Sequence, residues 1–361
     1  MQQVDETDIR AALARIGVAG ADEDIVASGR VQGLVVRDRN VGFSLDIGGL
    51  PAEAVEPLKQ QAEQAAANVQ GVVSVTCVLT AHKQAASAAP NAQKPAANRE
   101  KPAVFDRIGA VIAIASGKGG VGKSTVAVNL AIALHQAGLT TGLLDADIYG
   151  PSLPQLLNIK DRPEMNEDKQ LLPIQAYGLA AMSIGFMVPP EQAMIWRGPM
   201  VQGALLQMLN DVAWPSLDVL VIDMPPGTGD IQLTMAQRIP VTGALIVTTP
   251  SNLALADVRR AVAMFEKTDI PVFGMVENMA YMPLPDGGKA YPFGQSDMDA
   301  LTKETGLPVL ASLPLDAGLG AGNESGMPVL VQDSHDSAAI APLHALAKEM
   351  KTRLDQQRKK K

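Results

Sequence analysis

Short apolar runs alternate with segments of helical length from residue 108 to the end of the chain. The strongest runs are AVIAIAS at 110–116, TGLLDAD at 141–147, DVLVIDM at 218–224, GALIVTT at 243–249, PVFGMVEN at 271–278 and PVLASLPL at 308–315. Strands that are apolar on both faces and separated by helices are typical of a mainly parallel sheet with helices on both faces. Ligands of such sheets collect at the carboxyl ends of the strands, so candidate chemistry is expected directly after these runs.

Residues 1–82 have a different pattern. TDIRAALARI (7–16) has helical apolar spacing, and VGFSLDIG (41–48) places apolar residues at alternate positions, as a half-buried strand does. Together with AEAVEPLKQQAEQAAANV, read as a helix despite Pro57, and GVVSVTCVL, read as a final strand, this predicts helix, two strands, helix, strand. Cys77 falls in the last strand, where we interpret it as a small core residue.

A low-complexity segment separates the two patterns. HKQAASAAPNAQKPAANREKP (82–102) is rich in Ala, Pro, Gln and Asn and has no large apolar residue with which to form a core. The predicted organisation is a small α/β domain (1–82), a flexible linker (83–106), a larger α/β domain built on the mainly parallel sheet (107–356) and a basic tail (357–361).

Composition narrows the classes of partner and site. The net charge of -8 argues against nucleic acid as a partner, and the chain lacks an apolar run of the roughly 20 residues that span a bilayer. The first ten residues have no apolar signal core, so we expect a cytoplasmic protein. Cys77 is the only cysteine, which excludes intrachain disulfides and any site that needs several thiolates from one subunit.

The clearest chemical motif follows the first apolar run of the larger domain. GKGGVGKS (117–124) satisfies G-x-x-x-x-G-K-[ST] between a predicted strand and a predicted helix. Backbone N–H groups of such a loop bind phosphate oxygens, Lys123 reaches the β and γ phosphates, and Ser124 holds magnesium. The predicted ATP-binding residues of this segment are Gly117, Lys118, Gly119, Gly120, Val121, Gly122, Lys123, Ser124 and Thr125.

Carboxylates follow two further strands. Asp145 and Asp147 end one run, and Asp223 ends another. Phosphoryl transfer needs carboxylates near the metal and near the attacking water, so we expect Asp145 and Asp223 to hold Mg²⁺ with Ser124, partly through water. Asp147 is the candidate to orient the nucleophilic water. The Pro- and Gly-rich segment 225–230 is expected to move when the γ-phosphate leaves.

Lys118 is a second lysine in the same loop. Lys123 already holds the phosphates, so Lys118 is free to point across a two-fold interface and supply charge to a partner's nucleotide. KGGVGKS resembles the deviant Walker A motif of the MinD/ParA/nitrogenase iron protein class, in which this lysine works in trans. The resemblance implies an ATP-dependent homodimer with slow, dimer-linked hydrolysis, in which the catalytic residues are Lys118, Lys123, Asp147 and Asp223.

Longer segments narrow the resemblance. DADIYGPSLPQLL, IWRGPMVQGALLQML, LVIDMPPGTGDIQLTMAQ and GMVENMAYM resemble the Mrp/ApbC family of iron–sulfur cluster carrier ATPases, and the likeness covers nearly all the chain outside the linker. It implies adenine contacts from Asn278, Pro314 and Asp316. Alternatively, Asn278 is a capping residue at the end of a strand, and Pro314 is a residue that interrupts regular structure in a loop.

One position departs from this family. After ENM the family typically has C-x-x-C, which gives four thiolates across a dimer for iron–sulfur ligation. Leu284 and Gly287 stand in those places, and neither binds iron. The resemblance therefore implies ATP and Mg²⁺ as cofactors and an iron–sulfur cluster as cargo, but the chain's own cluster ligands are missing.

Three functions remain open. The first, which we favour, is a cluster carrier or assembly factor whose partner or client protein supplies the ligands. The second is a nucleotide-switched regulatory or positioning ATPase that carries no cluster. Relatives of that kind often touch membranes with a terminal helix, but Leu343, Leu346, Met350 and Leu354 predict a helix packed on its own domain. The third, a metabolic kinase or amidoligase, needs an acceptor pocket that no segment marks.

Overall fold

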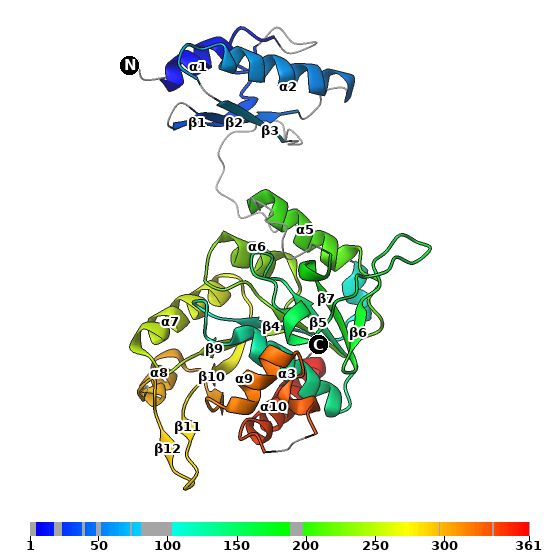
Figure 1. The fold of residues 1–361 in the computed structure, drawn as a ribbon, viewed down its shortest axis with the longest axis vertical. Helices are drawn as coiled ribbons and strands as arrows, with labels where there is room; N and C mark the ends of the chain where they lie inside the picture. Colours follow the sequence, from blue (N-terminus) through cyan, green and yellow to red (C-terminus); the bar gives the residue numbers. More distant parts are fainter. Residues whose placement is uncertain are drawn as a thin grey trace. The chain divides into compact units, whose positions relative to one another are not determined.

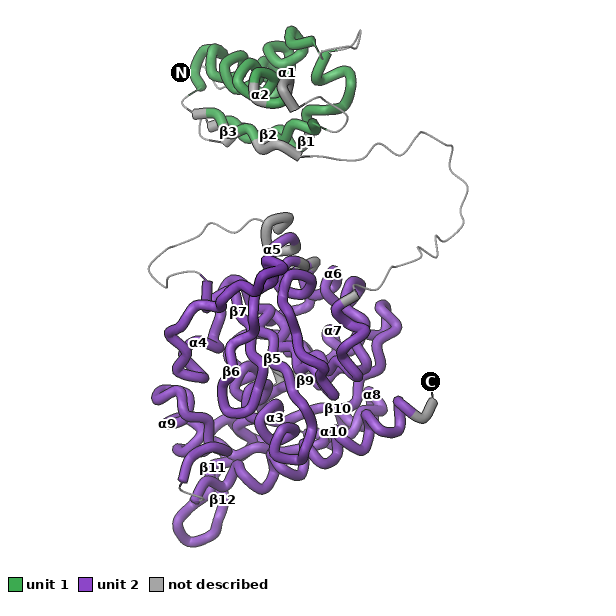
Figure 2. The backbone as a smooth tube through the Cα atoms, turned by 90° about the vertical axis from the view of Figure 1, so that its right-hand side faces the viewer, with its two compact units in different colours: residues 1–96 green, residues 97–361 purple. Residues whose placement is uncertain are grey.

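The computed structural model describes two compact units, residues 1–96 and residues 97–361 (Figure 2). The described residues are 5–17, 24–37, 40–47, 52–72, 74–80, 103–187, 198–295, 297–333 and 336–360. Most of the predicted linker lies outside these ranges, as do Trp196 and Arg197 of the WRGPM segment.

The smaller unit is a three-stranded sheet with two helices on one face (Figure 1). Its elements are α1 (Glu6–Leu13), β1 (Val31–Arg37), β2 (Asn40–Asp46), α2 (Ala52–Ala67) and β3 (Ser74–Thr80). The predicted order of helix, two strands, helix and strand is thus confirmed. β2 lies in the middle, antiparallel to β1 and parallel to β3.

Cys77 belongs to the core of this unit, as predicted. Phe43 and Leu45 of β2 are buried in the same cluster, and the Cys77 side chain is 7% exposed. Burial first, and then the charge of Glu63, raises the pKa of the Cys77 thiol to about 11. The thiol is therefore neutral at physiological pH, which is a poor state for metal binding.

The larger unit is built on an eight-stranded sheet in the order β13-β10-β9-β4-β8-β5-β7-β6. The strands are β4 (Val111–Ala115), β5 (Thr141–Asp145), β6 (Ile174–Ala176), β7 (Leu179–Ser183), β8 (Val219–Asp223), β9 (Gly243–Thr248), β10 (Val272–Glu277) and β13 (Val309–Ser312). All neighbours pair in parallel except β6 and β7. A separate hairpin is formed by β11 (Met282–Pro283) and β12 (Lys289–Ala290).

Helices flank this sheet on both faces (Figure 1). They are α3 (Lys123–Gln136), α4 (Leu153–Leu156), α5 (Gly198–Asn210), α6 (Asp230–Arg238), α7 (Asn252–Lys267), α8 (Met298–Thr305), α9 (Ala317–Ser325) and α10 (Ile340–Lys360). Short 3₁₀ turns occupy Ala103–Arg107, Ile184–Phe186 and Val329–Val331. The α/β fold class, with its mainly parallel sheet and preceding small domain, is confirmed.

All six strands predicted for the larger unit are present, but the sequence did not reveal β6, β7 or the short strands β11 and β12. Every residue of β7 is buried, because the strand lies inside the sheet between β5 and β6 and contacts the helix α3. Its sequence LAAMS has only two large apolar residues, so its local apolar signal is weak. Much of its burial comes from β5 and α3, which are distant in the sequence.

α10 packs on its own unit, as predicted. It contacts α3 and β13, and its stripe of Leu343, Leu346, Met350 and Leu354 is at most 3% exposed. The helix continues to Lys360 and so includes most of the basic tail. In the part of the chain that the structure describes, no helix combines the length and the apolar character needed to cross a membrane.

Candidate nucleotide-binding site

The phosphate-binding loop leaves the central strand β4 and enters α3, which begins at Lys123. Gly122 has a φ of 79°, and a Cβ there would lie 2.2 Å from Nδ2 of Asn278. Left-handed backbone and close approach both require glycine at this position. A Cβ on Gly117 would lie 2.3 Å from the Cβ of Asp257 on α7, so the start of the loop is tightly packed as well.

An open cavity of about 210 Å³ lies inside this loop. It is lined by Ser116, Lys118, Gly119, Gly120, Gly122, Lys123, Ser124, Thr125, Asp147 and Pro226. The N-terminus of α3 points its free N–H groups and partial positive charge at bound anions. The structure thus brings most of the predicted loop residues around one concave, phosphate-sized space.

Lys123, which lines this cavity, belongs to a buried ion pair. Nζ of Lys123 contacts Oδ1 of Asp223, and the two side chains are 6% and 0% exposed. Lys123 Nζ also lies 3.4 Å from the hydroxyl of Ser124. The other carboxylate oxygen of Asp223, Oδ2, is buried without a hydrogen-bond partner. An orphaned carboxylate oxygen is costly unless a ligand completes it.

Asp145 lies beside Asp223, because β5 and β8 pair in register at these two residues. The Asp145 carboxylate accepts hydrogen bonds from Ser183 Oγ at 3.0 Å and from the backbone N–H of Ser152, also at 3.0 Å. Burial first, and then the charge of Asp223, raises the pKa of Asp145 to about 7. A cation placed between the two carboxylates would favour their charged forms.

These groups fit Mg²⁺. The orphaned Asp223 oxygen, the neighbouring Asp145 and the Ser124 hydroxyl offer the hard oxygen ligands that this ion prefers. No cluster of three or more His, Cys, Asp or Glu suited to a metal occurs among the described residues. Two carboxylates and a hydroxyl are nevertheless enough for an ion that keeps several waters and takes phosphate oxygens as its remaining ligands.

Asp147 lies at the rim of the phosphate cavity and is half-buried. Burial raises its pKa most, the charge of Lys123 lowers it, and Asp223 raises it again, with a net upward shift. A second, open cavity of about 460 Å³ shares Asp147 and Pro226 with the first. A carboxylate with a raised pKa that borders two cavities is well placed to orient a water molecule.

The three residues that the resemblance assigned to adenine have different surroundings. Asn278 is buried and donates from Nδ2 to the Val121 carbonyl at 2.9 Å, which joins the end of β10 to the phosphate loop. Pro314 is buried in the loop after β13. Asp316 caps α9 by accepting from Leu319 N–H at 3.0 Å, and it also accepts from Ser337 Oγ at 2.8 Å. Contact with adenine stays a prediction for all three.

Two residues near the site carried no signal in the sequence. Asn323 on α9 donates from Nδ2 to the Thr125 hydroxyl at 2.9 Å. Asp257 on α7 is buried against Gly117 and forms an ion pair with Arg260. Neither belongs to a local motif, because each reaches the loop only through the packing of a distant helix.

Leu284 and Gly287 lie in the turn of the β11–β12 hairpin, which projects from the larger unit (Figure 1). The Gly287 N–H donates to the Leu284 carbonyl at 3.0 Å, and Gly287 has a φ of 84°. Lys289 stacks on the Tyr281 ring with Nζ 4.0 Å from its centroid. Met282, Tyr291 and Phe293 are between 37% and 50% exposed, so this region has an apolar surface but no thiolates.

Comparison with protein families gives two matches. A model described as ParA, the NUBPL iron-transfer P-loop NTPase family, matches residues 107–351. A model described as an iron–sulfur cluster assembly protein matches residues 6–77. Each of these ranges falls within one of the two compact units.

Curated relatives agree with the family models. An iron–sulfur cluster carrier protein of Pseudomonas fragi is 45% identical over 77% of this chain and 94% of its own length. One from Synechocystis is 38% identical over 91% of this chain and 92% of its own length. The resemblance that the sequence motifs indicated is confirmed.

Solved structures support the same fold. A nucleotide-binding protein from Archaeoglobus fulgidus in complex with ADP is 37% identical, with a TM-score of 0.56 over 63% of this chain and 90% of that chain. The cell division ATPase MinD of Pyrococcus furiosus is 22% identical, with a TM-score of 0.51 over 68% of this chain and 99% of that chain, and shows likeness of fold alone.

Proposed function

We propose a function for this chain, which belongs to the family of iron-transfer P-loop NTPases. It is a cytoplasmic homodimer that hydrolyses ATP, and it acts as an iron–sulfur cluster carrier or assembly factor. One observation carries the nucleotide half of this proposal. Lys123 lines the phosphate cavity and pairs with the buried Asp223, one of whose carboxylate oxygens has no partner, and this arrangement has the charges that MgATP needs.

The residues of the loop bind and orient the triphosphate. Backbone N–H groups of residues 119–124 face the β and γ phosphates, and Lys123 exchanges part of its contact with Asp223 for contact with phosphate oxygens. Ser124, Asp223 and Asp145 would hold Mg²⁺, partly through water, and the bound ion would supply positive charge against the charge that develops on the phosphates. Asp147 orients the attacking water, and ADP and phosphate are the products.

Lys118 completes the site in trans. It lines the rim of the phosphate cavity, where a partner protomer would meet it, and its own loop already has Lys123. A lysine supplied across a two-fold interface adds charge only when the dimer closes, which makes hydrolysis slow and dimer-linked. Closure around two nucleotides also gives the protein a state in which cargo is held or released.

The cargo half of the proposal is supported by family membership, and the cluster is a substrate of this protein. Leu284 and Gly287 supply no ligand, and Cys77 is buried with a raised pKa in the other unit. We propose that thiolates of a scaffold or client protein hold the cluster. The exposed apolar surface around the β11–β12 hairpin of the nucleotide-binding domain would bind the partner protein without coordinating the cluster.

The test combines two assays on the full chain. MgATP turnover is measured first, and anaerobic reconstitution with iron and sulfide follows, read by absorbance and iron content. We expect turnover by the chain alone, and transferable cluster only when a thiolate-bearing client is present. No affinity for adenine nucleotides at any magnesium concentration would overturn the proposal.

A second function is favoured by one observation. The absence of both cysteines at 284 and 287 suits a nucleotide-switched regulatory ATPase whose output is dimerisation. Nucleotide turnover without bound iron, in the presence and in the absence of thiolate-bearing clients, would establish this alternative.

A further inference from the structure

Gln232 on α6 is a buried polar side chain to which the proposed chemistry gives no role. It is 5% exposed and lines the second cavity together with Asp147 and Tyr149. Its Nε2 donates to the Pro225 carbonyl at 3.3 Å and also to the Pro226 carbonyl. One side-chain amide therefore holds two successive carbonyls of the segment 225–230, which we call the switch turn.

The switch turn is held from its other side by the start of the phosphate loop. The Gly227 N–H donates to the Ser116 carbonyl at 2.9 Å, and the Ser116 hydroxyl donates to the Lys118 carbonyl at 2.9 Å. Ser116 is only 1% exposed, so these bonds are shielded from water. A continuous set of hydrogen bonds thus connects Gln232, the switch turn, Ser116 and the backbone of Lys118.

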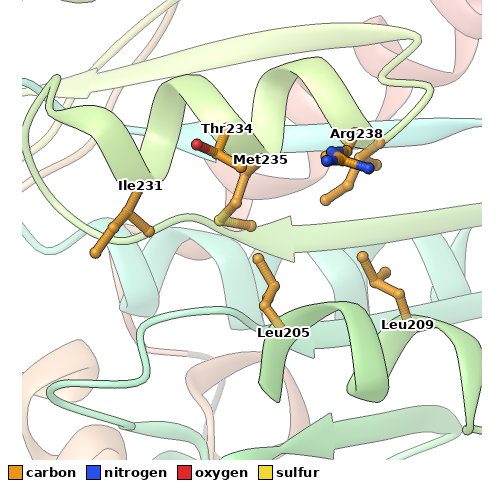
Figure 3. Close-up of a pocket in the computed structure, with 7 residues that line it drawn as sticks. Leu205, Leu209, Ile231, Thr234, Met235 and Arg238 are labelled. Atoms are coloured by element: carbon orange, nitrogen blue, oxygen red, sulfur yellow. The ribbon is translucent and has the colours of Figure 1, made fainter. Parts of the chain in front are cut away.

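α6 is a firm support for this contact. Figure 3 shows Ile231 and Met235 of α6 facing Leu205 and Leu209 of α5 across an apolar cavity of only about 10 Å³. Met235 is 1% exposed. Close apolar packing on this side fixes the helix, while Gln232 binds the turn that precedes it.

We infer that Gln232 is a positioning residue for ATP hydrolysis. Its amide holds the switch turn so that Pro226 borders the phosphate cavity beside Asp147, and the Gly227–Ser116 bond carries this position to Lys118. The inference rests on the proposed ATPase function. Nucleotide binding depends on residues 117–125, so Gln232 acts on turnover more than on binding.

The substitution Gln232→Glu tests this role with almost no change of shape. A carboxylate has no N–H to donate, and it would face two carbonyl oxygens, which repels the turn. We expect kcat for MgATP to fall about tenfold or more, with KM within about twofold of the unaltered protein. Gln232→Met, which removes the amide without adding charge, should lower kcat in the same direction.

Gln237→Glu is the matched control, because Gln237 lies on the same helix with an exposed side chain. It should leave kcat, KM and the thermal midpoint unchanged. A Gln232→Glu variant with unaltered kcat would overturn the inference. The inference would also be overturned if kcat fell and KM changed together, in proportion to a lowered thermal midpoint. That result would indicate a merely structural role.

Hydrogen exchange separates this inference from the proposed function. The Gly227 amide is protected by its bond to Ser116, so Gln232→Glu should speed exchange in the peptide 226–230 while Gln237→Glu should not. This readout needs no turnover. If the unaltered protein has no ATPase activity, the proposed function is refuted. If hydrogen exchange in the peptide 226–230 is unchanged in the Gln232→Glu variant, the positioning role is refuted.

Discussion

The phosphate loop and the β11–β12 hairpin belong to the same unit, but they differ in how well they match the family resemblance. The loop has the residues that the resemblance implies for nucleotide binding, whereas the hairpin lacks the cysteines that it implies for cluster binding. In the loop, Lys123 and Asp223 are buried against each other, and Gly117 and Gly122 are confined by neighbouring side chains. In the hairpin, Leu284 and Gly287 lie in the turn of a regular two-strand pairing, at the positions where the resemblance leads us to expect cysteines.

The difference follows from how strongly each region is coupled to the fold. Removing one partner of a buried ion pair destabilises the folded protein by several kcal/mol, so neither residue is easily substituted alone. A side chain on an exposed hairpin makes few contacts, and its loss removes a function at little cost in stability. We therefore expect nucleotide binding and cluster ligation to be separable properties in this fold.

The contrast is tested most severely by Lys123→Ala. This change leaves Asp223 charged and unpaired in the core, so we expect loss of MgATP binding and about 3–5 kcal/mol less stability. Titration calorimetry and denaturant unfolding measure the two effects. An unaltered affinity for MgATP would show that the buried pair is not the nucleotide site.

Lys118→Ala is the matched change at the other lysine of the loop. Since Lys123 remains, we expect binding within about threefold of the unaltered protein but at least tenfold slower turnover. Turnover at the unaltered rate would refute the role in trans. Measuring turnover against protein concentration separates a dimer-linked step from one that a single protomer performs.

Introducing cysteines at Leu284 and Gly287 tests whether the hairpin can bind a cluster when thiolates are present. Space around the Gly287 Cα is open, so the cost is the left-handed backbone, about 1 kcal/mol. We expect Leu284→Cys with Gly287→Cys to bind iron and sulfide on anaerobic reconstitution, through four thiolates of a dimer. The same pair of changes to serine is the control, and equal iron in both variants would contradict the expectation.

Cys77 gives the smallest expected effect. Its pKa of about 11 is two pH units above the ordinary value of 9.0, so the thiolate fraction at pH 8 is about a hundredfold lower than in the unfolded chain. Iodoacetamide should label the native protein slowly and the denatured protein fast. Because the folded pKa is raised, this group's contribution to stability is complete below pH 9 and is lost as the pH rises through 11. Rapid native labelling would show an accessible thiol.

Much of the fold was predictable because its signals are local. Apolar runs marked β4, β5, β8, β9, β10 and β13, and the stripe of Leu343, Leu346, Met350 and Leu354 marked the buried face of α10. β7 was not predicted because its small residues give a weak apolar signal, and it is α3 and the neighbouring strands that bury them. A local apolar pattern indicates which secondary structure a segment favours. The burial of a strand inside a sheet depends instead on the elements that pack around it in the tertiary structure.

The sequence by itself determined the phosphate loop, the carboxylates after the strands, the single cysteine and the absence of C-x-x-C, because each depends on residue type and short spacing. Only the tertiary structure decided that Lys123 pairs with Asp223, that Asp145 adjoins it with a raised pKa, and that Gln232 and Asn323 reach the switch turn and the loop. These contacts join residues up to 198 positions apart, and their energies arise from burial and register that no local segment contains.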